Sequence, residues 1–304
     1  MRVTLGLQMD ATTGRLREAA QRLLDAQQRI TSGKRIRSAS DDVTLTGRAM
    51  NIRSALRGLA QFAENNGLAK SALESVDAAV GSVADEIKLL REAAMQAGSS
   101  TLSAEARQGI VAQIQSIRTR LLALANTRVL DRYVFSGCRT DTPPLSESGG
   151  SPPYNYQGDT GAIMIRIQPG ATIQTNVTGD RLFNLGGAAA PGVRDLFTLT
   201  QSLEAAVESG DVSATSSLLG DIDANLTNVL GIRAQVGARV ARTEYNADAL
   251  AESTTRLQTL LSSLEDVDLP QAVVELKTRE NIYQAALAVT GRIMQISLVN
   301  YIDR

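Results

Sequence analysis

The chain has 304 residues with 31 basic and 32 acidic side chains, a formal net charge of −1, one cysteine and no histidine. This near-neutral balance gives no electrostatic reason to expect nucleic acid or an anionic membrane as a partner. Without histidine, the usual general base and the commonest metal ligand are missing, and one cysteine cannot form an intrachain disulfide or a multi-cysteine metal site. We therefore expect neither an enzyme nor a protein that holds a metal or cofactor.

Targeting signals are sparse in this sequence. The first thirty residues contain no signal-peptide-like apolar stretch, because polar residues such as Gln8, Asp10 and Arg15 interrupt it. No segment approaches the roughly 18 apolar residues that a membrane-spanning helix needs. We expect a soluble chain that stays in the cytoplasm or leaves it by a route that reads no such signal.

The first predicted element is a helix from about residue 10 to residue 32. Leu16, Leu23 and Ile30 are seven residues apart, and Gly33 is well placed to end the helix. The polar residues that follow can cap the next helix and place negative charge at its start. The segment 33–40 is therefore predicted to be a hinge. Its proposed key residues, with the cap candidates, are Gly33, Ser40, Asp41 and Asp42.

The next two elements are predicted to form an antiparallel helical hairpin. Apolar residues in alternating steps of three and four run from Leu59 to Ala97, with a polar break at Asn66. Such a rhythm is typical of helices that lie along one another. Ser103 opens a further helix that ends at about residue 127.

Prolines and glycines then interrupt the helical pattern. Apolar and polar residues alternate around Ile163, Ile165 and Ile167 and again around Ile173, with turn signals between the two runs. We expect a small sheet of about three strands in this region.

Helical pattern resumes near Val193 and runs, with a break at 209–211, to about residue 264. Polar residues interrupt its apolar seam at Arg233, Thr243 and Thr254, and a last helix of nearly thirty residues begins at Leu269. The expected fold class is mainly α, an elongated antiparallel bundle or coiled coil with paired terminal helices and a small β-rich insert. The expected domains are a terminal coiled coil (1–40 and 266–304), a helical bundle (41–140 and 191–265) and the β insert (141–190).

The last helix carries more apolar surface than one neighbouring helix can cover, while residues 1–32 offer only a narrow partner rich in alanine. Exposed apolar surface of this size normally marks an association site. A folded-back coiled coil within one chain is the alternative, but it leaves a second stripe uncovered. The predicted assembly residues are Leu16, Leu23, Ile30, Ile282, Tyr283, Leu287, Met294, Leu298 and Tyr301. We expect both terminal segments to be largely disordered in the free subunit and to become paired helices on assembly.

Two further features have ordinary explanations. Cys138 has no histidine to activate it, so a passive role is favoured over a nucleophile. The basic residues between Arg29 and Arg37 lack the aromatic neighbours of a nucleic-acid site. They are predicted to be a solvated part of the hinge, or to pair with Asp41 and Asp42.

Several segments, in order along nearly the whole chain, resemble the flagellin superfamily. Within it they are most similar to the proteins at the junction between the flagellar hook and the filament. The opening residues and the segments 30–36 and 40–42 look like the family's N-terminal signature. The segments 101–126, 132–137, 140–144, 228–239 and 283–298 resemble its central, return and terminal helical signatures. Val43 stands where the family pattern leads us to expect proline, and Cys138 where a thiol is unusual.

The resemblance implies a structural subunit that links hook-associated protein 1 to the flagellin filament. It also implies export without a cleaved signal peptide through the flagellar secretion system, protection by a cytoplasmic export chaperone, and assembly with further copies into a helical ring outside the cell. Flagellin itself is the alternative within the superfamily. A cytoplasmic coiled-coil signalling protein is the alternative of another class, but it gives no role to the β insert.

Overall fold

A computed structural model of the protein describes residues 2–36, 41–99, 102–147, 154–189 and 191–302. At residues 2–9, 147 and 293–302 it describes the backbone alone. The chain divides into two compact units, residues 1–58 with 253–304, and residues 59–252. No described helix is both long and apolar enough to cross a membrane.

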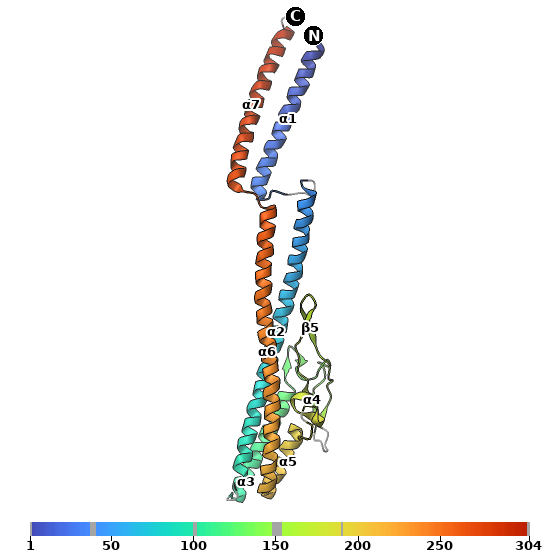
Figure 1. Ribbon diagram of the computed structural model, residues 1–304, viewed down its shortest axis with the longest axis vertical. Coiled ribbons are helices and arrows are strands. Elements are labelled where there is room, and N and C mark those ends of the chain that lie inside the picture. Colours follow the sequence, from blue (N-terminus) through green and yellow to red (C-terminus); the bar gives the residue numbers. More distant parts are fainter. Residues whose placement is uncertain (1, 37–40, 100–101, 148–153, 190, 303–304) are drawn as a thin grey trace. The chain divides into compact units, whose positions relative to one another are not determined.

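The first unit contains both ends of the chain. Helices α1 (Arg2–Ser32) and α7 (Leu269–Ile302) pack along one another, with the two termini at the same end (Figure 1). The start of α2 (Val43–Ala97) and the end of α6 (Val212–Glu265) complete the unit. The predicted pairing of the terminal helices is therefore confirmed.

Helix α1 ends and helix α2 begins where the sequence predicts. Gly33 follows α1 in the left-handed conformation, with a φ of 66°, and its N–H donates to the carbonyl of Ile30. Glycine adopts this conformation without the cost that a Cβ imposes. At the start of α2, the Leu45 N–H donates to the Asp42 carboxylate at 2.9 Å, so Asp42 caps the helix.

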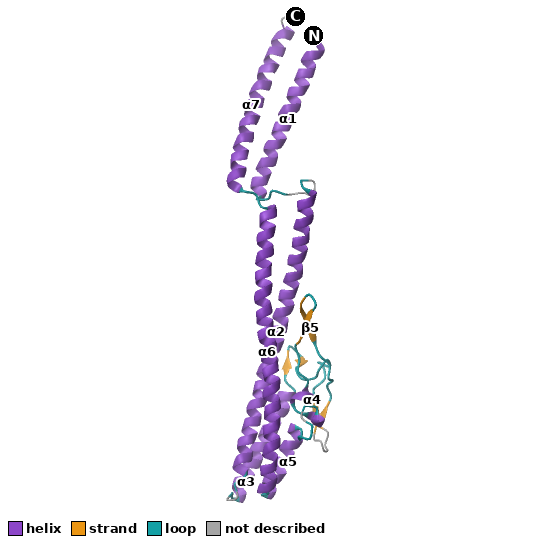
Figure 2. Ribbon diagram, in the orientation of Figure 1, coloured by secondary structure: helices purple, strands orange, loops and turns teal. Residues whose placement is uncertain are grey.

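The second unit combines helices with short strands (Figure 2). It contains residues 59–97 of α2, residues 212–252 of α6 and helix α3 (Ala104–Ala125), which packs on α5 (Leu196–Ser209). The remaining elements are β1 (Arg128–Val129), β2 (Arg132–Tyr133), β3 (Leu145–Glu147), β4 (Tyr154–Tyr156), β5 (Met164–Gln168), β6 (Ala171–Gln174), α4 (Gly179–Leu182) and the short 3₁₀ helix η1 (Leu185–Gly187). The mainly α fold with a small β-rich insert is thereby confirmed.

The expected three-stranded sheet is wrong in its pairing. The described strands form three separate antiparallel pairs, β1 with β2, β3 with β4, and β5 with β6. The β5–β6 hairpin packs on helices instead of on a third strand, because side chains of the helices bond to its backbone. The Asn65 side-chain amide donates to the Arg166 carbonyl at 2.9 Å, and that of Asn246 donates to the Ile167 carbonyl at 3.0 Å.

Polar breaks in the apolar rhythm of α2 and α6 meet at one level. The buried Asn66 amide donates to the Thr243 carbonyl at 2.7 Å and accepts from Asn246 at 3.3 Å. A buried polar group inside a helical seam favours the one register in which its hydrogen bonds are made. This polar layer therefore aligns α2 with α6 at the point where the β5–β6 hairpin attaches.

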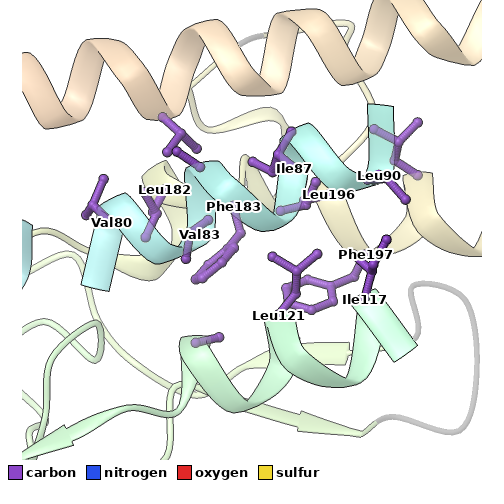
Figure 3. Close-up of a cluster of buried hydrophobic side chains, with 14 of the residues drawn as sticks. Val80, Val83, Ile87, Leu90, Ile117, Leu121, Leu182, Phe183, Leu196 and Phe197 are labelled. Atoms are coloured by element: carbon purple, nitrogen blue, oxygen red, sulfur yellow. The ribbon is translucent and has the colours of Figure 1, made fainter. Parts of the chain in front are cut away.

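The aromatic part of the core joins the insert to the helices. Phe135, Phe183 and Phe197 are fully buried, and the ring of Phe183 lies 6.0 Å from that of Phe135 and 5.4 Å from that of Phe197. Figure 3 shows Phe183 and Phe197 between apolar side chains of α2, such as Val83, and of α3, such as Leu121. The chain has four phenylalanines in all. Three of them therefore pack in the contact between the insert and the helices.

Candidate assembly site

The terminal pair, as we name α1 and α7 together, meets along a thin seam. Among the side chains that the structure describes in this pair, two alanines are the most buried, with Ala26 at 6% and Ala272 at 8% exposure. The larger residues predicted for assembly on α1, Leu16, Leu23 and Ile30, are half-buried, as is Tyr283 on α7. A seam built from small side chains removes little apolar surface from water, so it contributes little stability.

Several apolar side chains of the terminal pair are exposed beside this seam. Ile282 and Leu287 are 47% and 44% exposed. Other apolar residues of the terminal pair join them on the surface: Leu24, Leu269, Val273, Val274 and Val289. The adjacent apolar pairs Leu23–Leu24 and Val273–Val274 indicate this exposure in the sequence. Neighbouring residues of a helix point to different sides, so only one member of each pair can lie in the seam. We name this exposed set, with Ile282 and Leu287, the outer stripe.

Some predicted site residues lie outside the described side chains. These are Met294, Leu298 and Tyr301 near the end of α7, and Ser40 in the linker. The described hinge residues are Gly33, which ends α1, Asp42, which caps α2, and the exposed Asp41.

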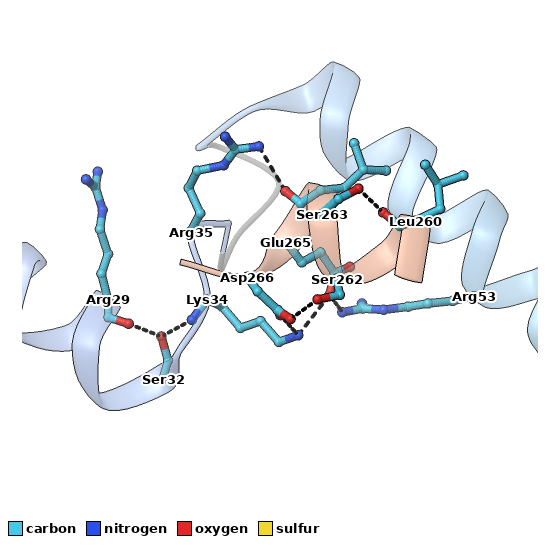
Figure 4. Close-up of polar contacts among 11 residues, drawn as sticks. Arg29, Ser32, Lys34, Arg35, Arg53, Leu260, Ser262, Ser263, Glu265 and Asp266 are labelled. Atoms are coloured by element: carbon cyan, nitrogen blue, oxygen red, sulfur yellow. Dashed lines mark hydrogen bonds and ion pairs between the residues drawn. The ribbon is translucent and has the colours of Figure 1, made fainter. Parts of the chain in front are cut away.

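The two linkers that connect the terminal pair to α2 and α6 are joined through their backbones. The Val267 N–H donates to the Gly33 carbonyl at 3.0 Å, and the Arg35 N–H donates to the Glu265 carbonyl at 2.6 Å. The Arg35 guanidinium also donates to the Leu264 carbonyl at 3.0 Å (Figure 4). The linkers are thus held together on both sides of the bridge between Lys34 and Asp266.

Charged side chains strengthen the contact between the two linkers. We name this group of residues the linker clasp (Lys34, Arg35, Arg53, Glu265 and Asp266). Glu265 is 3% exposed and receives the Arg53 guanidinium at 2.8 Å and the Lys34 ammonium at 3.6 Å. Lys34 also donates to Asp266 at 2.6 Å. The hydrogen bond from Lys34, followed by that from Ser262, holds the pKa of Asp266 below its ordinary value, while the bond to Asp266 raises the pKa of Lys34.

The linker clasp is expected to hold across the neutral range and to loosen at both extremes of pH. The lowered pKa of Asp266 stabilises the folded state above the ordinary value of 3.8, and this contribution is lost as pH falls through the folded pKa. The raised pKa of Lys34 stabilises it below the ordinary value of 10.5, and this contribution is lost as pH rises through the folded pKa. Amide protection factors at Arg35 and Val267 should therefore be flat between these limits.

Lys34→Gln provides the control for that experiment. Without the ammonium, protection of the Val267 amide should be lower at neutral pH and should change less as Asp266 titrates. Equal protection in the variant and the wild type would show that the backbone bonds alone hold the linkers.

Cys138 lies in a tight loop of the second unit. The backbone N–H groups of Cys138 and Gly161 donate to the Asp159 carboxylate at 2.7 and 2.8 Å. These bonds lower the pKa of Asp159. A Cβ at Gly137 would lie 2.2 Å from the Asp159 carbonyl oxygen, so only glycine fits there. The thiol belongs to an exposed residue of this loop. Within the described ranges, no three metal-ligating side chains gather into a site.

Two family models match the chain at its two ends. The model of the bacterial flagellin N-terminal helical region matches residues 4–140, and that of the C-terminal helical region matches residues 219–302. The two matches include the terminal pair, the linker clasp and the long helices of the second unit.

Individual relatives agree with these models. The chain is 26% identical to flagellar hook-associated protein 3 of Escherichia coli, over 89% of this chain and 90% of that protein. It is 23% identical to a flagellin of Listeria innocua, over 92% and 91% of the two chains. The solved structure of a putative flagellar hook-associated protein from Vibrio parahaemolyticus shares the fold, with a TM-score of 0.68 and 23% identity over 74% of this chain and all of that one.

Proposed function

The chain belongs to the flagellin family, and we propose that it is a structural subunit of the bacterial flagellum that assembles at the hook–filament junction. The observation that carries this proposal is the outer stripe, an apolar surface that the terminal pair leaves uncovered. Hook-associated protein 3 of Escherichia coli matches this chain more strongly than the Listeria innocua flagellin does, which favours a junction protein over flagellin.

The partners follow from that position. Copies of the chain form a helical ring, which rests on hook-associated protein 1 and presents a lattice to flagellin. A cytoplasmic chaperone covers the exposed apolar surface of the terminal helices before export. Export proceeds through the flagellar secretion channel without a cleaved signal peptide. In this scheme, segments 1–40 and 266–304 make the ring contacts, segments 41–140 and 191–265 form the supporting bundle, and residues 141–190 form the insert. The subunit does its work by packing alone, without enzymatic activity.

Deletion of the gene tests the proposal directly. Cells that lack the protein are expected to build hooks and to release flagellin into the medium, with no filaments attached, because the filament has no lattice on which to start. Electron microscopy of the cells and immunoblots of the medium give both readouts. Normal hooks with attached filaments would contradict the proposal. Bare hooks with no flagellin antigen in the medium would instead identify the chain as flagellin.

Cys138→Ser is expected to leave assembly and motility unchanged. The thiol has no histidine to activate it, and the loop is held by backbone bonds to Asp159 that serine preserves. Swimming speed and the number of filaments per cell, measured at equal protein levels, are the readouts. Loss of filament attachment in this variant would assign the thiol a role in the junction.

A further inference from the structure

The linker clasp lies at the base of the terminal pair, but none of its residues belongs to α1 or α7. Three of its residues lie in the linkers, and the other two lie on α2 and at the end of α6: Lys34, Arg35, Asp266, Arg53 and Glu265. The ion pairs that Figure 4 shows in the clasp therefore join the linkers to α2 and α6. The order of the clasp thus depends on α2 and α6 and not on whether α1 and α7 are helical.

The buried carboxylate of Glu265 makes this attachment firm. It receives the Arg53 guanidinium from α2 at 2.8 Å, and Lys34 Nζ from the linker lies 3.6 Å away. A buried charge is costly unless opposite charges and hydrogen bonds compensate it. Because moving Lys34 or Arg53 away would leave this charge less compensated, the clasp resists opening.

Within the terminal pair, the buried contacts gather next to the clasp, at the end opposite the two termini (Figure 1). Ala26 lies near the end of α1 and Ala272 in the first turn of α7, and both are buried. The Arg29 guanidinium lies 3.9 Å from the Glu275 carboxylate in the same region. Of the described side chains farther from the clasp on these two helices, none is buried. The pair is therefore held most firmly at its clasp end.

We propose that the linker clasp is the point from which the terminal pair orders, so that α1 and α7 come together from the clasp toward the two termini. Bringing two chain segments together costs entropy that grows with the length of the loop between them. The clasp has already closed that loop, because it holds the end of α1 beside the start of α7. Each further turn then adds contacts without a new nucleation cost. The proposal concerns the isolated chain and does not rest on the proposed function.

Hydrogen exchange of the isolated full-length protein, at a concentration too low for assembly, tests this order of events. The Arg35 and Val267 amides donate across the clasp and should exchange more slowly than the amides of the terminal pair. In α7, amides 273–276 should be protected more than amides 285–288, because the first group is closer to the clasp. Equal protection of the two groups, or greater protection of the second, would overturn the proposal.

Glu265→Gln removes the central charge of the clasp and preserves the shape of the side chain. We expect protection of amides 273–276 to fall by about tenfold, because the charged hydrogen bonds that close the clasp are weakened. Glu244→Gln is the matched control, since Glu244 is another α6 carboxylate that pairs with a cation of α2, Lys70, at 2.8 Å. This control should leave that protection unchanged. An equal loss in both variants, or no loss in Glu265→Gln, would contradict the proposal.

Ala272→Asp makes the converse change, since it disrupts the seam of the terminal pair and leaves every clasp residue in place. Burying an unpaired aspartate is costly, so amides 273–276 should lose their protection as α7 separates from α1. The Arg35 and Val267 amides should keep their protection to within about twofold, because local opening of the pair leaves the clasp closed. Loss of protection at these two amides would show that the clasp depends on the pair, which is the reverse of the proposal. Amides of residues 59–252 report in every variant whether the second unit is folded.

Discussion

Replacing Ile282 and Leu287 together by aspartate is expected to abolish incorporation of the protein into the flagellum while residues 59–252 remain folded. Ile282 and Leu287 are 47% and 44% exposed, so the isolated subunit depends on them less than on its core residues. Burying the exposed part of each side chain against a neighbour contributes roughly 1 kcal/mol, and an aspartate there must instead be desolvated. A helical assembly repeats this loss at every subunit. Immunoblots of purified hooks measure the incorporated fraction.

The control for this variant adds the same charge beside the outer stripe. Asn281→Asp with Gln284→Asp changes two exposed polar residues of the same turns of α7. It should incorporate at close to the wild-type level, apart from a modest effect of charge. Equal incorporation of the Ile282 and Leu287 variant would show that the outer stripe faces solvent in the flagellum.

The weak seam between α1 and α7 also determines how well these helices are ordered in the free subunit. Ordering a residue costs roughly 1 to 2 kcal/mol of backbone entropy, and the alanine-rich seam of the terminal pair recovers little of it. We therefore expect amides of α7 to exchange rapidly in dilute monomer and to become protected on assembly. Strong protection of α7 at low concentration would mean that the seam alone stabilises the pair.

Much of the fold follows from local patterns in the sequence. The seven-residue spacing of Leu16, Leu23 and Ile30 predicts a helix with one apolar face, and Gly33 and Asp42 mark its end and the start of the next helix by local backbone chemistry. These signals lie within a few residues of the structure that they specify. The helices α2, α3, α5 and α6 were predictable for the same reason.

Contacts between residues far apart in the sequence could not be predicted from local patterns. Lys34 and Asp266 of the linker clasp are 232 residues apart, and nothing in the spacing of surface charges predicts which of them meet. Alternation predicted the strand around Ile165 and the strand around Ile173 that pairs with it. It did not predict the helices on which they pack, because the asparagines that bond to this hairpin lie far away in the sequence.

Phe183→Ala is expected to destabilise the second unit by about 3 to 5 kcal/mol, the range measured for removing a fully buried aromatic ring. The ring is 0% exposed and contacts both Phe135 and Phe197, so its loss leaves a cavity that neither neighbour can fill without leaving its own site. Urea unfolding followed by circular dichroism measures the free energy of unfolding.

Phe62→Ala separates burial from the mere loss of an aromatic residue. Phe62 is half-buried on α2, so its ring is already partly hydrated and its removal should cost clearly less. If the two variants lost equal stability, the cluster would not be the point where the insert is joined to the helices. If only Phe183→Ala is severely destabilised, the loop after α4 is part of the folding unit.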